Sequence, residues 1–421
     1  MIQVPEAERA VGMLVYGTQG ERCQGKAKTV DEDFVVQEQL DLGEVSSDSE
    51  LGGYPLYRVE KRSVDTMHME RELSEALRSR VSYGGLKDKK SVSTQYVTPT
   101  SGRAARPERV EGRNFTATLV GFVDAPLSRR AVVGNRFQIL LRGCCPDVGP
   151  RVDEAFAAAD SMRLPNFFGM QRFGARGASH LVGRALVKKE FEEAVKVLLL
   201  HRGAELSPES EEARRAMAEG KYEKAAMLLG PGLDVEAKVA RRLSKAPGDW
   251  VGALRAVPIK LRRLLVNAYQ SYIFNLTLSK SLEEGEDISK YESGDNWGEL
   301  SEDGLRLLKV HGVRESPSAS PIPLVQTAGF AFRDYGSRFD RMTIEVMKEE
   351  DVNARMFYVD EMQEVSAEGG FRRPHMTVLD HSFQVRGDST ELKFTLAKGE
   401  YATVLLREVM KPERPIDSGL G

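Results

Sequence analysis

One carboxylate and three lysines share the stretch at residues 84–95, which has the sequence GGLKDKKSVSTQ. The carboxylate belongs to Asp88, and the lysines are Lys87, Lys89 and Lys90. Nearby cations favour the ionised form of a carboxyl group, and lysines also bind the phosphates of nucleic acids. These residue types therefore fit a nucleophilic carboxylate that acts on a nucleic acid. A solvated hairpin tip would carry the same charges, so the rest of the chain has to decide between the two interpretations.

The residues on either side of this stretch predict that a sheet positions Asp88. Residues 80–83 alternate polar and apolar side chains, and residues 92–97 are rich in β-branched and aromatic residues, as is typical of strands. Asp88 is therefore expected in a strand-to-strand connection, where a rigid sheet can present a loop side chain. Gly84 and Gly85 allow a close backbone approach or an unusual turn just before it.

Length and composition narrow the class of protein. The 421 residues are long for one domain and suit two. Hydrophobic residues make up 41% of the chain and charged residues 29%, which is typical of a soluble globular protein. No apolar run approaches the roughly 20 residues that span a bilayer, and the N-terminal sequence lacks the features of a signal peptide. We therefore expect no membrane association.

The cysteines are few. They are Cys23, Cys144 and Cys145, and none has the spacing to a second Cys or a His that zinc sites use. Such usage indicates a reducing compartment and no structural zinc. We therefore predict a cytoplasmic protein without a metal site.

Charge is distributed unevenly although the formal net charge is only -3. Residues 76–142 contain 13 Lys and Arg against 4 Asp and Glu, an excess of nine positive charges. Residues 279–303 contain 2 Lys against 9 Asp and Glu, an excess of seven negative charges. A basic segment inside a near-neutral protein indicates a localised face for phosphates, whereas the acidic segment must face elsewhere.

Five further motifs accompany the Asp88 stretch. They are KAKTVDEDFVVQEQ at residues 26–39, GNRFQILLR at 134–142, PNFFGMQRFG at 165–174, AYQSYIFN at 268–275 and FTLAKGEYATVLLRE at 394–408. In this order, and together with GLKDKKSVSTQ around Asp88, they resemble the motifs of the TruD family of tRNA pseudouridine synthases. The chain departs from the family pattern at Asp31, where the family often has Pro, and at Phe167, where it has Tyr.

The resemblance implies an α+β fold. A pseudouridine synthase domain with a central mixed or antiparallel sheet would comprise residues 1–166 plus 372–421. An α-rich TRUD domain, residues 167–371, would be inserted into it, and tRNA would bind in the cleft between the two. The reaction would convert uridine to pseudouridine, chiefly at position 13 of tRNA, without a metal or redox cofactor. We expect the protein to act as a monomer.

The resemblance also implies roles for single residues. Asp88 would be the catalytic carboxylate, which attacks the ribose or assists departure of the base. The substrate-binding residues would be Lys28, Asn135, Phe137 and Arg407. Lys28 would keep Asp88 ionised or orient it, Asn135 would hydrogen-bond the substrate, and the ring of Phe137 would stack on the uracil. The RNA-binding residues would be Lys87, Lys89, Lys90, Gln171 and Arg172.

Local patterns predict several further elements. The 3.6-residue spacing of apolar side chains predicts helices over residues 183–200, 208–229, 258–282 and 337–351. The acidic stretch at residues 283–303 is expected to be an excursion on the surface. Residues 401–406 are mostly apolar and are expected to form a strand.

Two other classes of function remain open at this point. A non-catalytic RNA-binding protein would have the same basic face, but it would not need an acid set among lysines. A hydrolase of glycosidic bonds would need a second carboxylate, for which Glu32 or Asp33 could serve. Retention of uracil in the product RNA separates a synthase from a hydrolase, and any turnover excludes a simple binder.

Overall fold

The structure is a computed structural model, and it describes residues 2–42, 45–47, 53–85, 87–88, 90–201, 208–229, 233–311 and 320–421. Lys89, one of the lysines beside Asp88, lies outside the described residues. No helix in this part of the chain is long and apolar enough to cross a membrane.

A mixed sheet of nine strands is built from the first and last parts of the chain. Its strands are β1 (Phe34–Leu40), β2 (Tyr54–Arg62), β3 (Val81–Tyr83), β4 (Val92–Pro99), β5 (Arg109–Gly112), β6 (Phe115–Val123), β7 (Val132–Leu141), β12 (Val378–Arg386) and β13 (Ser389–Ala397). Their order is β12-β13-β7-β1-β4-β2-β6-β5, with β3 paired to β4. The β1–β4 pair is parallel, whereas the other pairs described in this sheet are antiparallel. The predicted α+β fold with a mixed central sheet is confirmed, and β3 and β4 are the strands expected around Asp88.

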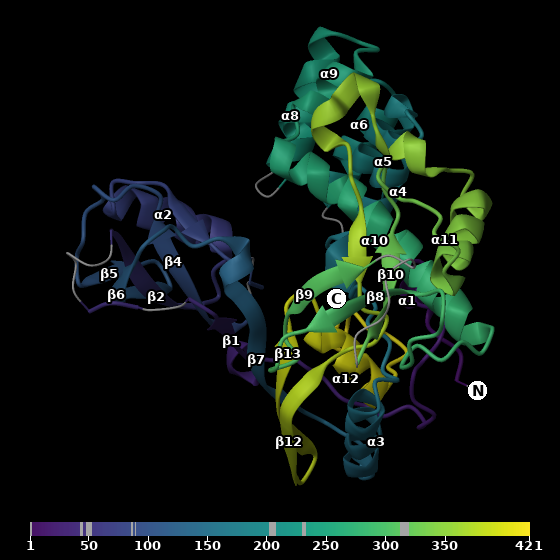
Figure 1. Cartoon of the computed structure of the whole chain (residues 1–421). Helices are drawn as coiled ribbons and strands as arrows, with labels where there is room; N and C mark the ends of the chain where they lie inside the picture. The colour runs from purple at the N-terminus through teal and green to yellow at the C-terminus, as the bar shows by residue number, and fades with distance from the viewer. Residues whose placement is uncertain are drawn as a thin grey trace.

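One end of this sheet forms a lobe with helix α2 (Thr66–Ala76) that stands apart from the rest of the molecule (Figure 1). Met69 and Leu73 on one face of α2 are fully buried, and they share a hydrophobic cluster with Tyr57 of β2. The carboxylate of Asp65 accepts two backbone N–H bonds in the first turn of the helix, which is how an N-cap satisfies orphan donors. These contacts fix the sheet from which the Asp88 loop projects.

The other end of the sheet packs against α3 (Val148–Asp160), and α12 (Ala402–Met410) packs against α3 and shares the same hydrophobic core. Phe34, Phe137 and Phe394 come from three adjacent strands and lie in the core cluster here. Ring centroids are 5.8 Å apart between Phe34 and Phe137, and 5.4 Å apart between Phe137 and Phe394. The centre of the sheet is therefore filled by aromatic side chains.

Helices dominate residues 179–283 (Figure 1). They are α4 (Ser179–Val187), α5 (Phe191–Leu200), α6 (Pro208–Ala218), α7 (Tyr222–Leu228), α8 (Asp234–Lys245), α9 (Trp250–Arg255) and α10 (Ile259–Glu283). Helix α10 confirms the predicted third helix. Each of the first two predicted helices is a pair of helices in the structure. The chain turns between the two members of each pair at a residue with left-handed backbone, Lys189 (φ 60°) in the first and Gly220 (φ 73°) in the second. The apolar spacing continues across each turn because both helices of a pair pack in one core.

A second, smaller sheet follows the long helix α10. Its strands are β8 (Asn296–Leu300), β9 (Leu307–His311), β10 (Ile322–Thr327) and β11 (Gly370–Arg372), in the order β11-β10-β8-β9. Helix α11 (Arg338–Glu349) packs against α10 and β10 and confirms the predicted fourth helix. A short helix, α1 (Glu6–Arg9), begins the chain.

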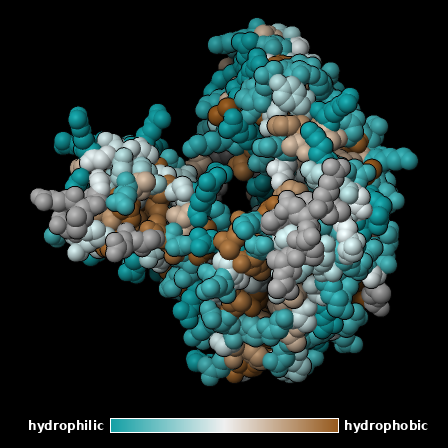
Figure 2. Space-filling view, in the orientation of Figure 1, coloured by the Kyte–Doolittle hydropathy of each residue, from teal (hydrophilic) through white to brown (hydrophobic). Residues whose placement is uncertain are grey.

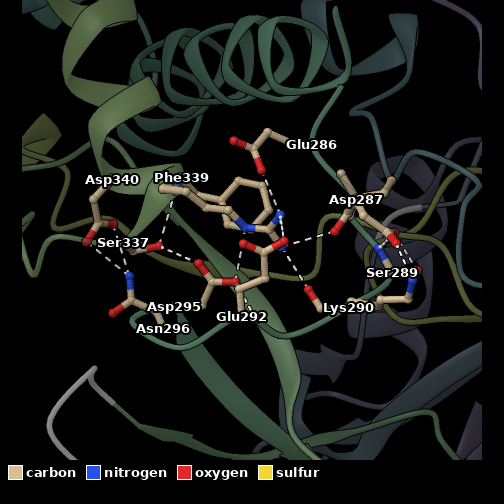
Figure 3. Close-up of polar contacts among 12 residues, drawn as sticks. Glu286, Asp287, Ser289, Lys290, Glu292, Asp295, Asn296, Ser337, Phe339 and Asp340 are labelled. Atoms are coloured by element: carbon tan, nitrogen blue, oxygen red, sulfur yellow. Dashed lines mark hydrogen bonds and ion pairs between the residues drawn. The ribbon is translucent and has the colours of Figure 1, made fainter. Parts of the chain in front are cut away.

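The acidic stretch at residues 283–303 is only in part the surface excursion that its composition predicts, with exposed acids at Glu283, Glu284, Glu292, Glu302 and Asp303. Strand β8 lies within it, and Asp295 is only 1% exposed. Carboxylates of Glu286, Glu292 and Asp295 converge on the guanidinium of Arg338, at 2.8, 3.1 and 3.1 Å (Figure 3). Arg338 itself is 8% exposed. Three of the acids therefore neutralise one buried cation of α11, which composition alone cannot reveal.

Residues 402–406 belong to a helix and not to the strand predicted over residues 401–406, and Tyr401 is the N-cap of that helix. Helix α12 spans nine residues, and all of them are buried. Because every face of the helix is covered, its apolar residues need not follow the 3.6-residue spacing of a half-exposed helix. A short apolar run of this kind does not distinguish a helix from a strand.

The cysteines also differ from the prediction. Cys23 and Cys145 form a disulfide, with their Cα atoms 5.4 Å apart, and Cys144 is free and buried. The two bonded residues are separated by 122 positions, so their spacing gave no sign of the pair. Disulfides are rare in most reducing compartments. The cysteines therefore no longer support the prediction of such a compartment.

The two predicted domain boundaries, after Asn166 and before Arg372, lie next to each other. The Arg372 side chain donates hydrogen bonds to the backbone and side-chain oxygens of Asn166, at 3.1 and 2.5 Å. Pro165 and His375 form an antiparallel β-bridge beside them. A segment inserted into another domain has to leave and return at neighbouring points, and this arrangement allows it. The division of the chain into an interrupted domain and an inserted domain stays a prediction.

A buried cluster of charges joins α12 to the N-terminal segment. Arg407, which is 2% exposed, donates from Nε to Glu8 Oε2 at 2.6 Å and from Nη1 to Glu408 Oε1 at 2.7 Å. Its Nη2 donates to the carbonyl of Val15 at 2.9 Å. The guanidinium also lies 4.1 Å from the ring centroid of Tyr16. This set of contacts occupies the Arg407 side chain on all sides.

Replacement of Arg407 should destabilise the protein strongly. In Arg407→Met, Glu8 and Glu408 would remain buried without their cation, and breaking a buried ion pair in this way costs about 3–5 kcal/mol. We expect the free energy of unfolding, measured by chemical denaturation, to fall by this amount. Arg414→Met is the control, because Arg414 is 82% exposed in its pair with Asp417, and its effect should stay within about 0.5 kcal/mol. Equal stabilities of the two variants would contradict the structural role of Arg407.

Candidate active site

Asp88 lies in the connection between β3 and β4, with a side chain that is 44% exposed. Its Oδ2 accepts a hydrogen bond from Lys28 Nζ at 2.7 Å. Lys28 precedes β1, so the parallel pairing of β1 with β4 brings together two residues that are 60 positions apart. Among the described residues, none donates a hydrogen bond to Asp88 Oδ1. One carboxylate oxygen is thus held while the other is open.

Lys28 itself is held firmly. Its φ of 57° lies in the left-handed region, which costs a residue other than glycine on the order of 1–3 kcal/mol. Its side chain is 7% exposed, and its ammonium lies 4.5 Å from the ring centroid of Phe34. Strain of this kind persists where the surroundings over-determine a residue, and it clusters at functional sites. The fixed ammonium therefore gives Asp88 a defined orientation.

Lys87 points into the protein and not toward solvent. Its side chain is 8% exposed and its Nζ lies 2.8 Å from Oε1 of Glu38, whose side chain is fully buried. Glu38 Oε2 accepts a further hydrogen bond from the backbone N–H of Tyr96 at 3.2 Å. Lys87 is thus engaged in a buried ion pair and is not available for a phosphate contact in this arrangement. Lys90, by contrast, is exposed.

Gly84 makes the close approach that the sequence allows. A Cβ atom at this position would lie 1.9 Å from Val132 Cγ2 and 3.2 Å from Glu38 Oε1. No side chain fits there unless β7 moves. The start of the Asp88 loop is therefore pressed directly against the beginning of β7.

The backbone of the loop is held from beneath by Lys61 of β2. Lys61 is 2% exposed, and its Nζ donates to the carbonyl of Asp88 at 3.1 Å and to that of Val64 at 2.8 Å. The carbonyl of Lys87 lies 3.4 Å from the same nitrogen. Burial lowers the pKa of Lys61 to about 8, although the charge of Asp88 opposes this shift. Ser91 Oγ is a second donor to the Asp88 carbonyl, at 2.9 Å.

Asn135 and Phe137 both lie on β7, next to this loop. Asn135 pairs across the sheet with Glu38 of β1, and its buried Oδ1 accepts no hydrogen bond from the part of the chain that the structure describes. Phe137 is 7% exposed and packs between Phe34 and Phe394. A base could stack on its face only if one of these neighbours moved. The structure therefore brings Asn135 to the site with an open acceptor, whereas Phe137 lies mostly within the core.

The other predicted contacts lie farther along the sheet and the helices. The amide of Gln171 exchanges hydrogen bonds with Thr403 Oγ1 at 2.8 and 3.1 Å. Arg172 Nε donates to Ser271 Oγ at 3.1 Å, and the residue is half-buried. Arg407 is enclosed in the cluster described above, so a direct contact with a substrate would have to break its ion pairs. We therefore do not propose Arg407 as a substrate-binding residue.

A cavity of about 630 Å³ adjoins the Asp88 loop. Its basic lining residues are Arg130, Arg306, Arg372, Arg373 and Lys398. Asp88 does not line the cavity, but Val132, which contacts the loop at Gly84, does. Figure 2 shows the surface hollowed between the α2 lobe and the helical part of the molecule. The cavity therefore offers a positively charged surface next to the start of the Asp88 loop.

Arg372 is the most unusual of these cations. Its guanidinium lies 4.1 Å from the ring centroid of Phe168 and donates to the carbonyl of Gly399 at 2.9 Å. It forms no ion pair with a carboxylate of the described residues, whereas Arg373 pairs with Glu400 and Arg306 with Asp41. Burial lowers the pKa of Arg372 to about 10. A half-buried cation without a carboxylate partner among the described residues is suited to an anionic ligand.

The carboxylates near Asp88 are already engaged. Asp33 is 1% exposed and accepts a bidentate set of hydrogen bonds from Arg142, at 2.7 to 3.0 Å. Burial alone would raise the pKa of Asp33, but these bonds lower it overall, so Asp33 cannot supply a proton at neutral pH. Glu32 forms an ion pair with Arg62. Among the described residues, no group of three or more His, Cys, Asp or Glu could hold a metal ion.

Two residues that hold the Asp88 loop, Lys61 and Glu38, were not among the site residues predicted from the sequence. A signal for Lys61 was present, because Tyr57, Val59 and Lys61 occupy alternate positions of β2, and the first two are fully buried. A lysine in the inward row of a strand must find partners inside the protein. The missing information was the identity of those partners, which are backbone carbonyls of a distant loop.

Comparison with known proteins places these residues in a wider context. The family model described as "tRNA pseudouridine synthase D (TruD)" matches residues 10–409. The chain is 34% identical over 432 residues to a protein of Pyrobaculum arsenaticum named "Probable tRNA pseudouridine synthase D", with 100% of both chains covered. A protein of the same name from Methanopyrus kandleri is 32% identical over 371 residues, covering 86% of each chain. The crystal structure of a TruD protein from Methanosarcina mazei matches with a TM-score of 0.77 and 26% identity, covering 99% of this chain and 100% of that one.

Proposed function

Because this chain belongs to the TruD family of tRNA pseudouridine synthases, we propose that Asp88 is the catalytic carboxylate of its reaction. The enzyme is an isomerase that converts uridine in tRNA to pseudouridine. The observation that supports Asp88 most strongly is the state of its side chain. It is 44% exposed, held at Oδ2 by Lys28, and open at Oδ1.

The reaction itself explains why one carboxylate suffices. The bond between the uracil nitrogen and the ribose breaks, the base turns, and a bond from a ring carbon replaces it, so no water is consumed. A glycosidase, in contrast, uses two carboxylates that cooperate across the scissile bond. Asp88 Oδ1 would attack the ribose or assist departure of the base. Lys28 would orient the carboxylate through its hydrogen bond to Oδ2 while this occurs.

The base needs partners of its own once it has left the stack. Asn135 would hydrogen-bond the uracil, and its unpaired Oδ1 is suited to the N3–H donor of the ring. An unpaired buried acceptor costs about 1–3 kcal/mol, which a bound base would recover. Phe137 would stack on the base after a movement of Phe34 or Phe394 exposes a face of its ring. We further propose position 13 of tRNA as the target, as the resemblance in the motifs implies.

The tRNA backbone would follow the basic cavity beside the Asp88 loop. Arg130 and Lys398 are exposed there, and Lys90 is exposed within the loop. Arg372 has no carboxylate partner among the described residues, so a phosphate could complete its hydrogen bonds. Arg172 is near enough for its charge to act on Arg372, and it would extend this basic surface together with Gln171.

Three further properties are proposals. Residues 167–371 would form the inserted TRUD domain, and the cavity lies where the chain enters and leaves it. The enzyme would act as a monomer, as we expect from the sequence. It would act in the cytoplasm, where its tRNA substrate is found.

The alternatives raised by the sequence are less well supported. A simple RNA-binding protein would have no use for an exposed carboxylate held by a strained lysine. A hydrolase would need a second free carboxylate, whereas Asp33 is buried against Arg142 and Glu32 forms an ion pair with Arg62. Membership of the family also favours a synthase over both.

Substitution of the proposed nucleophile gives the first test of function. Asp88→Asn keeps the shape of the side chain but removes its charge, so it should abolish formation of pseudouridine. We would incubate unmodified tRNA with the variant and map the product by carbodiimide-dependent primer extension. Asp351→Asn is the control, because Asp351 is also an exposed partner of a lysine, in the helical part of the chain. Turnover by Asp88→Asn within about tenfold of the wild type, roughly 1.4 kcal/mol in barrier, would exclude Asp88 as nucleophile.

The salt dependence of tRNA binding tests the basic surface. Each phosphate contact contributes about 0.7–0.9 to the slope of log affinity against log salt. Replacing Lys90, Arg130 and Lys398 together by Gln should therefore reduce the slope by roughly two to three units. Neutralising the exposed lysines of the helical part, Lys196, Lys221 and Lys224, should leave it unchanged. The reverse pattern would place the RNA on the helices.

Phe137 can be tested by two substitutions. Phe137→Ala removes a ring that is packed between two others, and we expect a loss of about 3–5 kcal/mol in the free energy of unfolding. Phe137→Leu fills most of the volume, and it should cost less than about 1.5 kcal/mol. If the uracil stacks on the ring, the Leu variant should still lose on the order of tenfold in kcat/KM, within the 1–3 kcal/mol of base stacking. Full activity of a folded Leu variant would assign Phe137 to the core alone.

A further inference from the structure

Lys61 is a buried lysine that the proposed chemistry does not use. It is 2% exposed and comes from β2, which is not part of any motif that pointed to the site. Among the described residues, it forms no ion pair within salt-bridge distance of a carboxylate. Burying a lysine without such a partner is costly. Its retention therefore requires a compensating role.

The partners of Lys61 define that role. Its Nζ lies 2.8 Å from the carbonyl of Val64, 3.1 Å from that of Asp88 and 3.4 Å from that of Lys87. An ammonium has three N–H donors, and here three carbonyl oxygens surround them. Two of these carbonyls belong to the catalytic loop, and the third belongs to the turn before α2. The side chain thus connects the loop to the rigid lobe beneath it.

We propose that Lys61 is a positioning residue, whose ammonium fixes the backbone of the Asp88 loop and thereby aims the carboxylate at the ribose. This inference rests on the proposed role of Asp88. Lys28 holds the carboxylate at Oδ2, while Lys61 holds the backbone carbonyl of the same residue. Backbone and side chain of Asp88 are therefore fixed by two different lysines.

Other side chains hold parts of this loop but cannot replace Lys61. Ser91 Oγ donates to the Asp88 carbonyl from within the loop, so it does not connect the loop to β2. Thr66 Oγ1 accepts the N–H of Lys87 at 3.0 Å, which restrains the loop one residue earlier. Lys61 is the described side chain that joins the carbonyl of Asp88 itself to the sheet.

The charge on Lys61 makes the proposal sensitive to pH. Burial and the charge of Lys87 lower its pKa, the charges of Asp88 and Asp65 raise it, and the resulting value is about 8. A neutral amine keeps two donors and presents a lone pair to the third carbonyl. As pH rises through 8, the loop should therefore lose its anchor and kcat should fall. The stability of the fold responds in the opposite direction. In the unfolded chain Lys61 has the ordinary pKa of 10.5, so between pH 8 and 10.5 the unfolded state binds more protons at this group than the folded state does. The contribution of Lys61 to stability therefore rises with pH in this range.

The decisive variant is Lys61→Met, which keeps the length of the side chain but removes its charge and its donors. A small misplacement of a catalytic group can cost on the order of 100-fold in rate, so we expect kcat to fall between tenfold and 100-fold. The dissociation constant of the tRNA complex should stay within twofold, because Lys61 does not reach the surface. Circular dichroism at the assay temperature establishes that the variant is folded.

Lys411→Met is the matched control. Lys411 is also 2% exposed, and its Nζ also donates to a carbonyl, that of Glu408, at 3.0 Å, as well as to Thr18 Oγ1 at 2.6 Å. It lies at the end of α12, outside the site. Both variants should lose stability, but only Lys61→Met should lose kcat. Equal losses of kcat in the two variants would reduce Lys61 to a structural residue.

A measurement on the wild-type enzyme keeps the inference testable if Lys61→Met does not fold. The kcat of the wild type should decline with an apparent pKa of about 8, while the protein remains folded. If kcat stays constant from pH 7 to 9.5, the reaction does not require the charged form of Lys61, and the inference is wrong. If Asp88→Asn is fully active, the proposed function itself fails; if Asp88→Asn is inactive and folded Lys61→Met keeps full kcat, only the inference about Lys61 fails.

Discussion

The ion pair between Lys28 and Asp88 is the interaction on which the site depends. It joins residues that are 60 positions apart, and it exists because β1 and β4 run side by side in the same direction within an otherwise antiparallel sheet. The residue at its inner end, Lys28, adopts a left-handed backbone. The free-energy cost of this backbone conformation has to be offset by surrounding contacts. Here these are the contacts of the Lys28 ammonium with the ring of Phe34 and with the carboxylate of Asp88.

Four described lysines around the Asp88 loop show how environment assigns different tasks to one residue type. Lys28 binds the carboxylate of Asp88, Lys61 binds backbone carbonyls, Lys87 neutralises buried Glu38, and Lys90 is exposed. Of the two lysines of the Asp88 motif that the structure describes, Lys87 is internal and Lys90 is exposed. The phosphate-binding surface that we propose therefore draws mainly on residues elsewhere in the chain.

That surface is assembled from segments far apart in sequence. Arg130 precedes β7, Arg372 ends β11, and Lys398 follows β13, yet all three line one cavity beside the loop. The contact between Gly84 and Val132 connects the cavity to the Asp88 loop. A site of this form can hold a flexible RNA strand against a rigid carboxylate. Rigid presentation is important because a reacting group gains most from being held in place before the substrate arrives.

The sequence by itself determined the chemistry and the class of fold. The motif around Asp88 and its order among five others identified the family, and strand alternation placed Asp88 between β3 and β4. Residue types and local spacing carry this information, because they reflect the chemistry of single side chains and the period of single elements. Helix α12 was mistaken for a strand for the same reason, since full burial removes the period.

Only the tertiary structure decided which partners these residues have. Nothing in the sequence pairs Lys87 with Glu38, Lys61 with the Asp88 carbonyl, or Cys23 with Cys145. It also decided that Arg407 serves an internal ion-pair cluster and that Phe137 lies between two other rings. Contacts of this kind depend on how distant elements pack, and the free energy that selects them is a sum over the whole core, which no local pattern contains.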